Sequence, residues 1–133
     1  MTANPLRYLD SLRWGLIPHW AKDKSIGNRM INARMETLAE KPSFKKPFKS
    51  QRCILPAQGF YEWQNLTDRK QPLFIFRADK KPITFAGLWE HWVDKETGEV
   101  IDSCTIITTK ASRLLEKIHD RMPVIFEYEK AKE

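Results

Sequence analysis

Short apolar runs separated by polar and turn-forming residues follow one another from the middle of the chain onward. Their length and their content of β-branched and aromatic residues are typical of strands. They predict five strands, at residues 52–56, 59–63, 72–77, 83–89 and 103–109. The segment 95–98 has the composition of a hairpin turn between the last two. A final short strand is predicted over 124–126, directly after Pro123.

Apolar residues with helical spacing follow the strand at 103–109. Ala111, Leu114, Leu115 and Ile118 repeat at i, i+3, i+4 and i+7, and Thr109 stands where a capping side chain is needed. This spacing predicts a helix over 110–118, and a second helix is predicted to begin at Glu127. Strands and short helices together predict a single strand-rich α+β domain.

Composition excludes several classes of protein. The chain has 133 residues, 41% of them hydrophobic, which is enough for a core and excludes intrinsic disorder. It contains no apolar run of membrane-spanning length, and its first residues lack an apolar signal core. We therefore expect a cytoplasmic protein, nucleoid-associated if bacterial, with no membrane partner. Cys53 and Cys104 lack metal-type spacing to each other or to histidine, so neither a metal nor another cofactor is expected.

The positive charge is concentrated in the first part of the chain. Residues 1–52 contain 11 basic and 4 acidic side chains, a net charge of +7, whereas residues 53–133 contain 12 and 13, a net charge of −1. Five of the basic residues fall within twelve positions around Phe44 and Phe48: Lys41, Lys45, Lys46, Lys49 and Arg52. Cations beside aromatic rings suit single-stranded nucleic acid. A solvated helix face with both rings in the core explains the same pattern.

Three segments carry polar residues in positions that suggest chemistry. Asn32, Arg34 and Glu36 alternate, so an extended backbone would aim all three toward one polar ligand. Glu62 interrupts an apolar strand, where burial would raise its pKa and suit it to proton transfer, although an outward-facing strand position explains it equally. His119 follows the predicted helix and suits either a cap or a proton shuttle.

Five motifs give the chain a resemblance to a known family. They are Arg-Trp-Gly-Leu-Ile-Pro at 13–18, Asn-Ala-Arg-Met-Glu-Thr at 32–37, Arg-Cys-Ile-Leu-Pro-Ala at 52–57, Gly-Phe-Tyr-Glu-Trp at 59–63 and His-Asp-Arg-Met-Pro at 119–123. In this order they resemble the SRAP family, the SOS response-associated peptidases. The resemblance implies a β-barrel-like sheet with flanking short helices. It also implies processing of abasic sites in single-stranded DNA through a covalent protein–DNA crosslink.

The resemblance assigns roles to individual residues. Asn32 would position the terminal residue that forms the crosslink, Glu62 would act as general acid and base, and His119 would help to open the abasic sugar. Arg34 and Arg121 would hold phosphates next to the lesion. The basic run adds Lys45 and Lys46 as predicted DNA contacts.

One departure from the family pattern affects the predicted mechanism. The chain begins Met-Thr-Ala-Asn where the resemblance implies Met-Cys-Gly-Arg with a nucleophilic cysteine. We therefore expect residues 1–133 to form a single SRAP domain that is incomplete at the N-terminus and lacks the N-terminal catalytic segment. Cys53 and Cys104 are expected to be structural, because a thiol in an apolar strand has a raised pKa.

Two alternative functions remain open at this point. The chain could be an autoprocessing peptidase that uses another nucleophile, or a noncatalytic domain that binds single-stranded nucleic acid. Whether it is an enzyme and what oligomeric state it adopts do not follow from the sequence.

Overall fold

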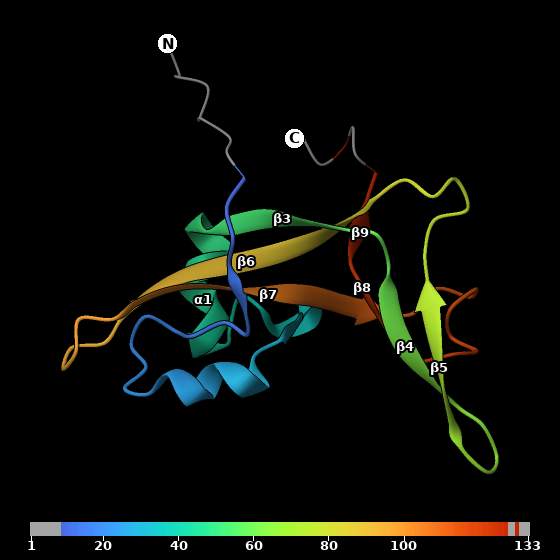
Figure 1. Ribbon diagram of the computed structural model, residues 1–133, viewed down its shortest axis with the longest axis horizontal. Helices are drawn as coiled ribbons and strands as arrows, with labels where there is room; N and C mark the ends of the chain where they lie inside the picture. Colours follow the sequence, from blue (N-terminus) through green and yellow to red (C-terminus); the bar gives the residue numbers. More distant parts are fainter. Residues whose placement is uncertain (1–8, 128–129, 131–133) are drawn as a thin grey trace.

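The computed structural model describes residues 9–127 and residue 130 (Figure 1). Its elements, in chain order, are β1 (Arg13–Trp14), η1 (Lys24–Arg29), β2 (Asn32–Arg34), η2 (Met35–Thr37), α1 (Pro42–Ser50), β3 (Arg52–Ala57), β4 (Phe60–Asn65), β5 (Lys70–Ile75), β6 (Ile83–Val93), β7 (Val100–Lys110), β8 (Arg121–Pro123) and β9 (Ile125–Phe126). The strands form a seven-stranded main sheet and a separate β4–β5 ribbon. The predicted α+β class is confirmed.

Strand β7 organises the main sheet, because four other strands pair with it. β1 and β2 run parallel to it, and β6 and β8 run antiparallel. Thr108 is paired with Arg34 of β2 and with Pro123 of β8, so these two strands lie on opposite edges of β7. This arrangement brings residues 32–34 and 121–123 to the same end of one long strand.

The segment 121–126 fills the space where β6 and β7 diverge. The two strands pair from Gly87–Ile106 to Val93–Val100, and then separate. β8 continues on the edge of β7, and β9 continues on the edge of β6. Between them, the Val124 N–H donates to the Ile107 carbonyl at 2.8 Å and the Ala86 N–H donates to the Val124 carbonyl at 2.9 Å. One short segment therefore satisfies backbone groups of both diverging strands.

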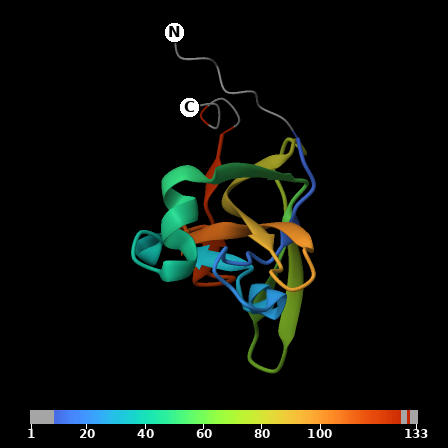
Figure 2. The same cartoon turned by 90° about the vertical axis from the view of Figure 1, so that its left-hand side faces the viewer.

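The β4–β5 ribbon stands beside the end of the main sheet where β8 and β9 lie (Figure 1). Figure 2, turned by 90°, shows α1 on the opposite side of the molecule from this ribbon. The ribbon contacts the main sheet through the Phe60 ring, which meets the Phe85 ring edge to face with 5.8 Å between centroids.

The Trp-Gly-Leu-Ile-Pro motif enters the core immediately after β1. Gly15 has a φ of +123°, and a Cβ at this position would lie 2.5 Å from the Gly27 carbonyl oxygen, so only glycine fits. Leu16 and Ile17 that follow are fully buried. The Ile17 N–H donates to the hydroxyl of Ser103, a fully buried residue of β7, at 2.8 Å.

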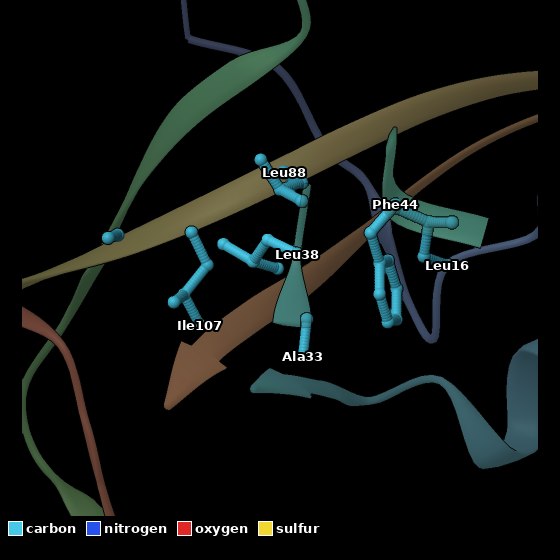
Figure 3. Close-up of a cluster of buried hydrophobic side chains, with 7 residues drawn as sticks. Leu16, Ala33, Leu38, Phe44, Leu88 and Ile107 are labelled. Carbon is cyan, nitrogen blue, oxygen red and sulfur yellow. The ribbon is translucent and has the colours of Figure 1, made fainter. Parts of the chain in front are cut away.

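The hydrophobic core lies between the main sheet and α1 (Figure 3). Its buried members come from six different parts of the chain and are Leu16, Ala33, Leu38, Phe44, Ala86, Leu88 and Ile107. Phe44 and the partly buried Phe48 both pack there from α1. The two rings that accompany the basic run are therefore core residues and do not form a base-stacking surface.

The predicted helix over 110–118 is wrong. Strand β7 continues to Lys110, and residues 113–118 form consecutive turns. The N–H groups of Glu116 and His119 donate to the carbonyls of Ser112 and Leu115, but these bonds do not continue into a regular helix. Ala111 is buried and Leu115 and Ile118 are partly buried, but Leu114 is 81% exposed, so the four residues do not pack as one helical face. The helix predicted from Glu127 falls largely on residues outside the described ranges.

The remaining predictions of local structure are mostly confirmed. All five predicted strands form, and the turn at 95–98 joins β6 to β7. Residues 32–37 are extended only as far as Arg34, and the 3₁₀ turn η2 begins at Met35. The strand predicted over 124–126 forms as β9 at its last two residues, and a further strand that was not predicted, β8, precedes it at 121–123. None of the helices in the described residues is long and apolar enough to cross a membrane.

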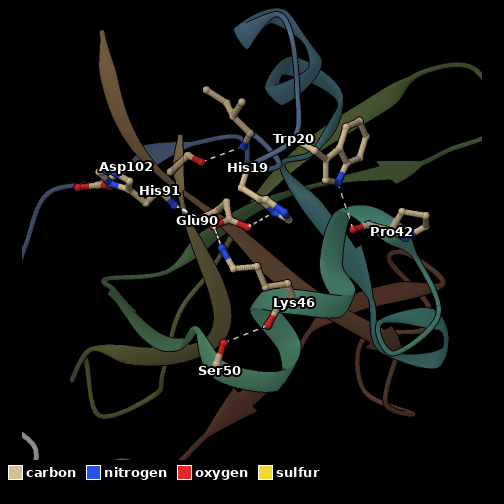
Figure 4. A network of polar contacts seen from close by, with 10 residues as sticks. His19, Trp20, Pro42, Lys46, Ser50, Glu90, His91 and Asp102 are labelled. Atoms are coloured by element: carbon tan, nitrogen blue, oxygen red, sulfur yellow. Dashed lines mark hydrogen bonds and ion pairs between the residues drawn. The ribbon is translucent and has the colours of Figure 1, made fainter. Parts of the chain in front are cut away.

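A buried carboxylate joins α1 to β6. The Glu90 side chain is fully buried, and its two oxygens lie 3.3 Å from His19 Nδ1 and 3.3 Å from Lys46 Nζ (Figure 4). Both partners are about half exposed. A buried carboxylate without partners is costly, so Lys46 and His19 together permit Glu90 at this position.

We expect Lys46→Met to destabilise the fold, because Glu90 would lose one of two side-chain partners while remaining buried. Because Lys46 is half exposed, the loss of unfolding free energy should be smaller than for a fully buried ion pair, and we expect about 1–3 kcal/mol. Lys45→Met is the matched control, since Lys45 is an exposed neighbour on the same helix and has no carboxylate partner in the described part of the chain. Chemical denaturation measures both variants. If Lys46→Met were as stable as Lys45→Met, Lys46 would have no structural role.

Candidate functional site

Glu62 lies on the inner face of the β4–β5 ribbon. Along β4 the exposure alternates: Tyr61 is 75% exposed and Trp63 is 55% exposed, whereas the Glu62 side chain is 23% exposed. Gln64, on the same face as Glu62, donates to the Lys117 carbonyl at 3.4 Å. The inner face of β4 therefore lies against the 112–120 segment. The outward-facing interpretation of Glu62 is wrong.

His119 faces Glu62 from that segment. Its Nε2 lies 3.9 Å from Glu62 Oε1, longer than a hydrogen bond but within the range of an ion pair. The Arg121 N–H donates to His119 Nδ1 at 3.1 Å, which makes Nδ1 an acceptor and assigns the proton of the neutral ring to Nε2. Asp120 Oδ1 also lies 3.2 Å from Nδ1, and the Arg121 carbonyl oxygen lies 3.4 Å from it. In the neutral form an Nε2–H group therefore points toward a carboxylate.

Arg121 is held by an ion pair that the sequence did not predict. Its two terminal nitrogens donate to the two Glu36 oxygens at 2.8 and 2.9 Å, and one of them also reaches the Thr108 carbonyl at 3.0 Å. The Arg121 guanidinium holds the pKa of Glu36 at about 2, well below its ordinary 4.5. Glu36 in turn raises the pKa of Arg121. The guanidinium predicted to hold a DNA phosphate is thus already paired with a carboxylate.

Asn32 and Arg34 lie on the exposed side of β2. They flank the buried Ala33, so both side chains stand on one face, two residues or roughly 7 Å apart. Arg34 lies opposite Thr108 in the β2–β7 ladder, and Arg121 donates to the same Thr108 from the other edge. In the described residues Arg34 has no carboxylate within 4 Å. The structure therefore places Arg34 near Arg121, whereas no contact joins Asn32 to Glu62 or His119.

Lys45 and Lys46 do not lie with these residues. Both are on α1, which packs against β6 and β3 and lies away from the β4–β5 ribbon (Figures 1 and 2). Lys46 forms an ion pair with Glu90. Their role as DNA contacts stays a prediction.

Cys104 is buried and Cys53 is partly buried, as expected of structural residues. Burial raises the pKa of the Cys53 thiol to about 12 and also raises that of Cys104. They are free thiols on β3 and β7, the two strands that flank β6 in the main sheet. Neither is suited to form a thiolate at neutral pH. The described residues also contain no cluster of three or more His, Cys, Asp or Glu side chains that could hold a metal.

Comparison with known proteins identifies the family. The family model described as SOS response associated peptidase (SRAP) matches residues 2–133. The chain belongs to the SRAP family. The Abasic site processing protein YoqW of Bacillus subtilis is 56% identical over 126 residues, which cover 94% of this chain and 56% of that protein. The Abasic site processing protein HMCES of Xenopus tropicalis is 36% identical over 146 residues, 94% of this chain and 44% of that protein.

Solved structures confirm the SRAP fold. A crystal structure of a protein from Bacteroides thetaiotaomicron matches with a TM-score of 0.86 and 37% identity over 91% of this chain and 55% of that one. Another, from Bordetella bronchiseptica, matches with a TM-score of 0.77 and 32% identity over 87% and 60%. This SRAP chain spans about half the length of the curated relatives it matches.

The Glu36–Arg121 pair predicts a specific acid sensitivity. Because the pKa of Glu36 is lowered from 4.5 to about 2 in the folded state, the pair stabilises the fold above pH 4.5, and this contribution is lost as pH falls toward 2. Glu36→Gln should therefore be less stable than the unmodified chain near pH 6, and the difference should disappear by about pH 2. Thermal unfolding at several pH values measures this.

Glu40→Gln serves as the control for the acid-sensitivity experiment. Glu40 is exposed four residues further along and has no ion-pair partner in the described ranges. Its substitution should leave the pH dependence of stability unchanged. A Glu36→Gln variant with the pH profile of the Glu40→Gln variant would show that the ion pair does not form in solution.

Proposed function

We propose that this chain processes abasic sites in single-stranded DNA. The observation that carries the proposal is the meeting of Glu62 and His119, at 3.9 Å, next to two arginines at the end of β7. A carboxylate and an imidazole with an Nε2–H form an acid–base pair, and neighbouring guanidinium groups suit phosphates. The names of the SRAP relatives, abasic site processing proteins, agree with this chemistry.

The acid–base pair supports opening of the abasic sugar. In the closed form, C1′ carries a hydroxyl group and is bonded to the ring oxygen O4′. One member of the pair takes the hydroxyl proton as the C1′–O4′ bond breaks, and the other gives a proton to O4′. The products are an aldehyde at C1′ and a hydroxyl group at C4′. Glu62 as the base and the Nε2–H of His119 as the acid fit these two transfers.

Arg34 is the better placed of the two arginines to receive a phosphate. It is exposed and without a carboxylate within 4 Å in the described part of the chain, whereas Arg121 is bound by Glu36. We therefore assign the first phosphate contact to Arg34. Arg121 holds His119 in place through its backbone N–H, and contacts DNA only where a phosphate displaces Glu36.

Covalent capture of the opened aldehyde requires a nucleophile other than the two cysteines described above. The family resemblance implies an N-terminal cysteine, whose amine nitrogen and thiol sulfur would both bond to C1′ and close a ring, while the aldehyde oxygen leaves as water. Asn32 would then position that terminal residue. We likewise propose that residues 1–133 form one SRAP domain and supply its acid–base pair and its phosphate contacts.

Glu62→Gln should slow aldehyde formation in an abasic oligonucleotide. Removing a general base typically costs a hundredfold or more, and we expect a loss of at least about tenfold here. A hydroxylamine probe that condenses with free aldehyde measures the rate. Binding of an undamaged oligonucleotide should change little. Glu116→Gln, an exposed neighbour in the turn segment, is the control and should keep the full rate.

A Glu62→Gln variant that opens the sugar as fast as the unmodified chain would contradict the catalytic assignment. If the chain nevertheless binds the oligonucleotide, a noncatalytic single-strand-binding domain would be the better description.

The 133-residue polypeptide should bind abasic DNA without forming an SDS-stable adduct. Its second residue is threonine, and the pKa of both cysteine thiols is raised. Denaturing gel electrophoresis after incubation with an abasic oligonucleotide tests this. For the same reason, iodoacetamide at pH 8 should leave Cys53 and Cys104 of the folded chain largely unmodified, as measured by mass spectrometry. A rapid adduct through either thiol would overturn their structural assignment.

A further inference from the structure

Helix α1 carries lysines at successive turns of one side. Lys45 and Lys49 are four residues apart in the helix, and Lys41 is its N-cap residue, one turn before Lys45. All three are exposed, whereas Phe44 and Pro47 of the same helix are buried. We call Lys41, Lys45 and Lys49 the α1 lysine track.

The track lacks counter-ions. In the described ranges no carboxylate lies within 4 Å of any of its three lysines, whereas their neighbour Lys46 is bound to the buried Glu90. The first turn of α1 contains no acidic residue either. The charges of the track therefore point into solvent from a helix that Lys46 and the aromatic core residues fix to β6.

This arrangement is unfavourable for the helix itself. Like charges four residues apart repel each other, and a cation near a helix N-terminus opposes the helix dipole. Each effect is a few tenths of a kcal/mol at an exposed site. The dipole disfavours Lys41 and Lys45 but favours Lys49, which lies in the last turn, and repulsion acts along the whole row. The row has no carboxylate partner in the described residues, which points to an external anion.

The geometry favours a linear polyanion over other anionic partners. A turn of α-helix rises about 5.4 Å, so the track presents charges in a row along roughly 12 Å. Stable membrane binding uses several apolar side chains beside the lysines, but the apolar residues of α1 face the core, and the exposed ring at its start is the single Trp20, which donates to the Pro42 carbonyl. A nucleic-acid backbone carries regularly repeated charges and needs no apolar contact.

We infer that the α1 lysine track binds the phosphate backbone of a nucleic-acid strand, at a surface separate from the Glu62–His119 pair. α1 and the β4–β5 ribbon lie on opposite sides of the molecule (Figure 2), so the track contacts nucleotides away from the abasic site. The choice of DNA as the strand rests on the proposed function. The charge row itself does not depend on abasic-site chemistry.

The salt dependence of binding to an undamaged 30-nucleotide single strand tests this inference. Each phosphate contact contributes about 0.7 to the slope of log K against log salt concentration, so the variant K41Q/K45Q/K49Q should reduce the slope by about 2. Between 50 and 200 mM salt, the affinity of the unmodified chain should then fall about twentyfold more than that of the variant. Fluorescence anisotropy measures both.

Two matched variants separate the track from net charge and from folding. K22Q/K81Q/K95Q removes the same charge from exposed positions outside α1 and should change the slope by less than one. K41R/K45R/K49R keeps the charges and should keep the slope. Because the glutamine substitutions remove repulsion within α1, the melting temperature of K41Q/K45Q/K49Q should not fall.

Equal slopes for K41Q/K45Q/K49Q and K22Q/K81Q/K95Q would overturn the inference. So would loss of binding to phosphatidylserine vesicles by K41Q/K45Q/K49Q alone, with an unchanged oligonucleotide slope, since this would indicate a membrane surface. The aldehyde-formation assay of Glu62→Gln tests the acid–base pair independently of the salt-dependence experiment. Failure of that experiment would leave the slope result intact, and failure of the slope experiment would leave the acid–base pair intact.

Discussion

The position of Val124 between two diverging strands is the constraint on which the site depends. β6 and β7 pair as a long hairpin and then separate, which would leave backbone groups of both strands without partners. Val124 bonds to Ile107 of β7 and accepts from Ala86 of β6, so residues 121–126 must cross the gap. The crossing fixes Arg121 on the edge of β7. His119 is only two residues before Arg121 in the chain, so its position is fixed as well. The histidine is therefore held by the main sheet, although it lies in an irregular turn segment.

Three carboxylates show how placement determines what a glutamate does. Glu90 is fully buried between two cationic or protonatable partners and links α1 to the sheet. Glu36 is partly exposed but bound at both oxygens by Arg121, so it fixes the turn after β2 to the end of β7. Glu62 has no cation closer than His119 in the described residues, at 3.9 Å. Of the three, only Glu62 is free of a cationic partner at hydrogen-bond distance in the described residues: its Oε1 accepts only from the Trp63 N–H, at 3.2 Å. Its carboxylate is therefore the one best able to exchange protons with a bound sugar, which is why the proposed chemistry centres on it.

The sequence predicted features that depend on local periodicity and missed those that depend on distant contacts. The strands were predictable because they are short apolar runs rich in β-branched and aromatic residues and bounded by turn-forming residues, and the motifs placed Glu62 and His119 in one site. The helix over 110–118 failed because its apolar spacing is real but Leu114 finds no surface to cover, and β7 extends through Lys110. The Glu36–Arg121 pair joins residues 85 positions apart. No local pattern carries that information, since it arises only from the pairing of β2 and β8 with opposite edges of β7.

The basic run illustrates the same limit for charge. In the sequence, Lys45 and Lys46 are adjacent and equivalent, and both appear as candidates for nucleic-acid contact. In the structure, one points to solvent and the other binds a buried carboxylate. The basic residues among the first 52 therefore divide into those that are paired with a carboxylate of the fold and those that remain available to a ligand. Lys46 belongs to the first group and Arg34 to the second. Electrostatic binding can draw only on the second group, so the surface available to a polyanion is smaller, and more precisely placed, than the net charge of the chain suggests.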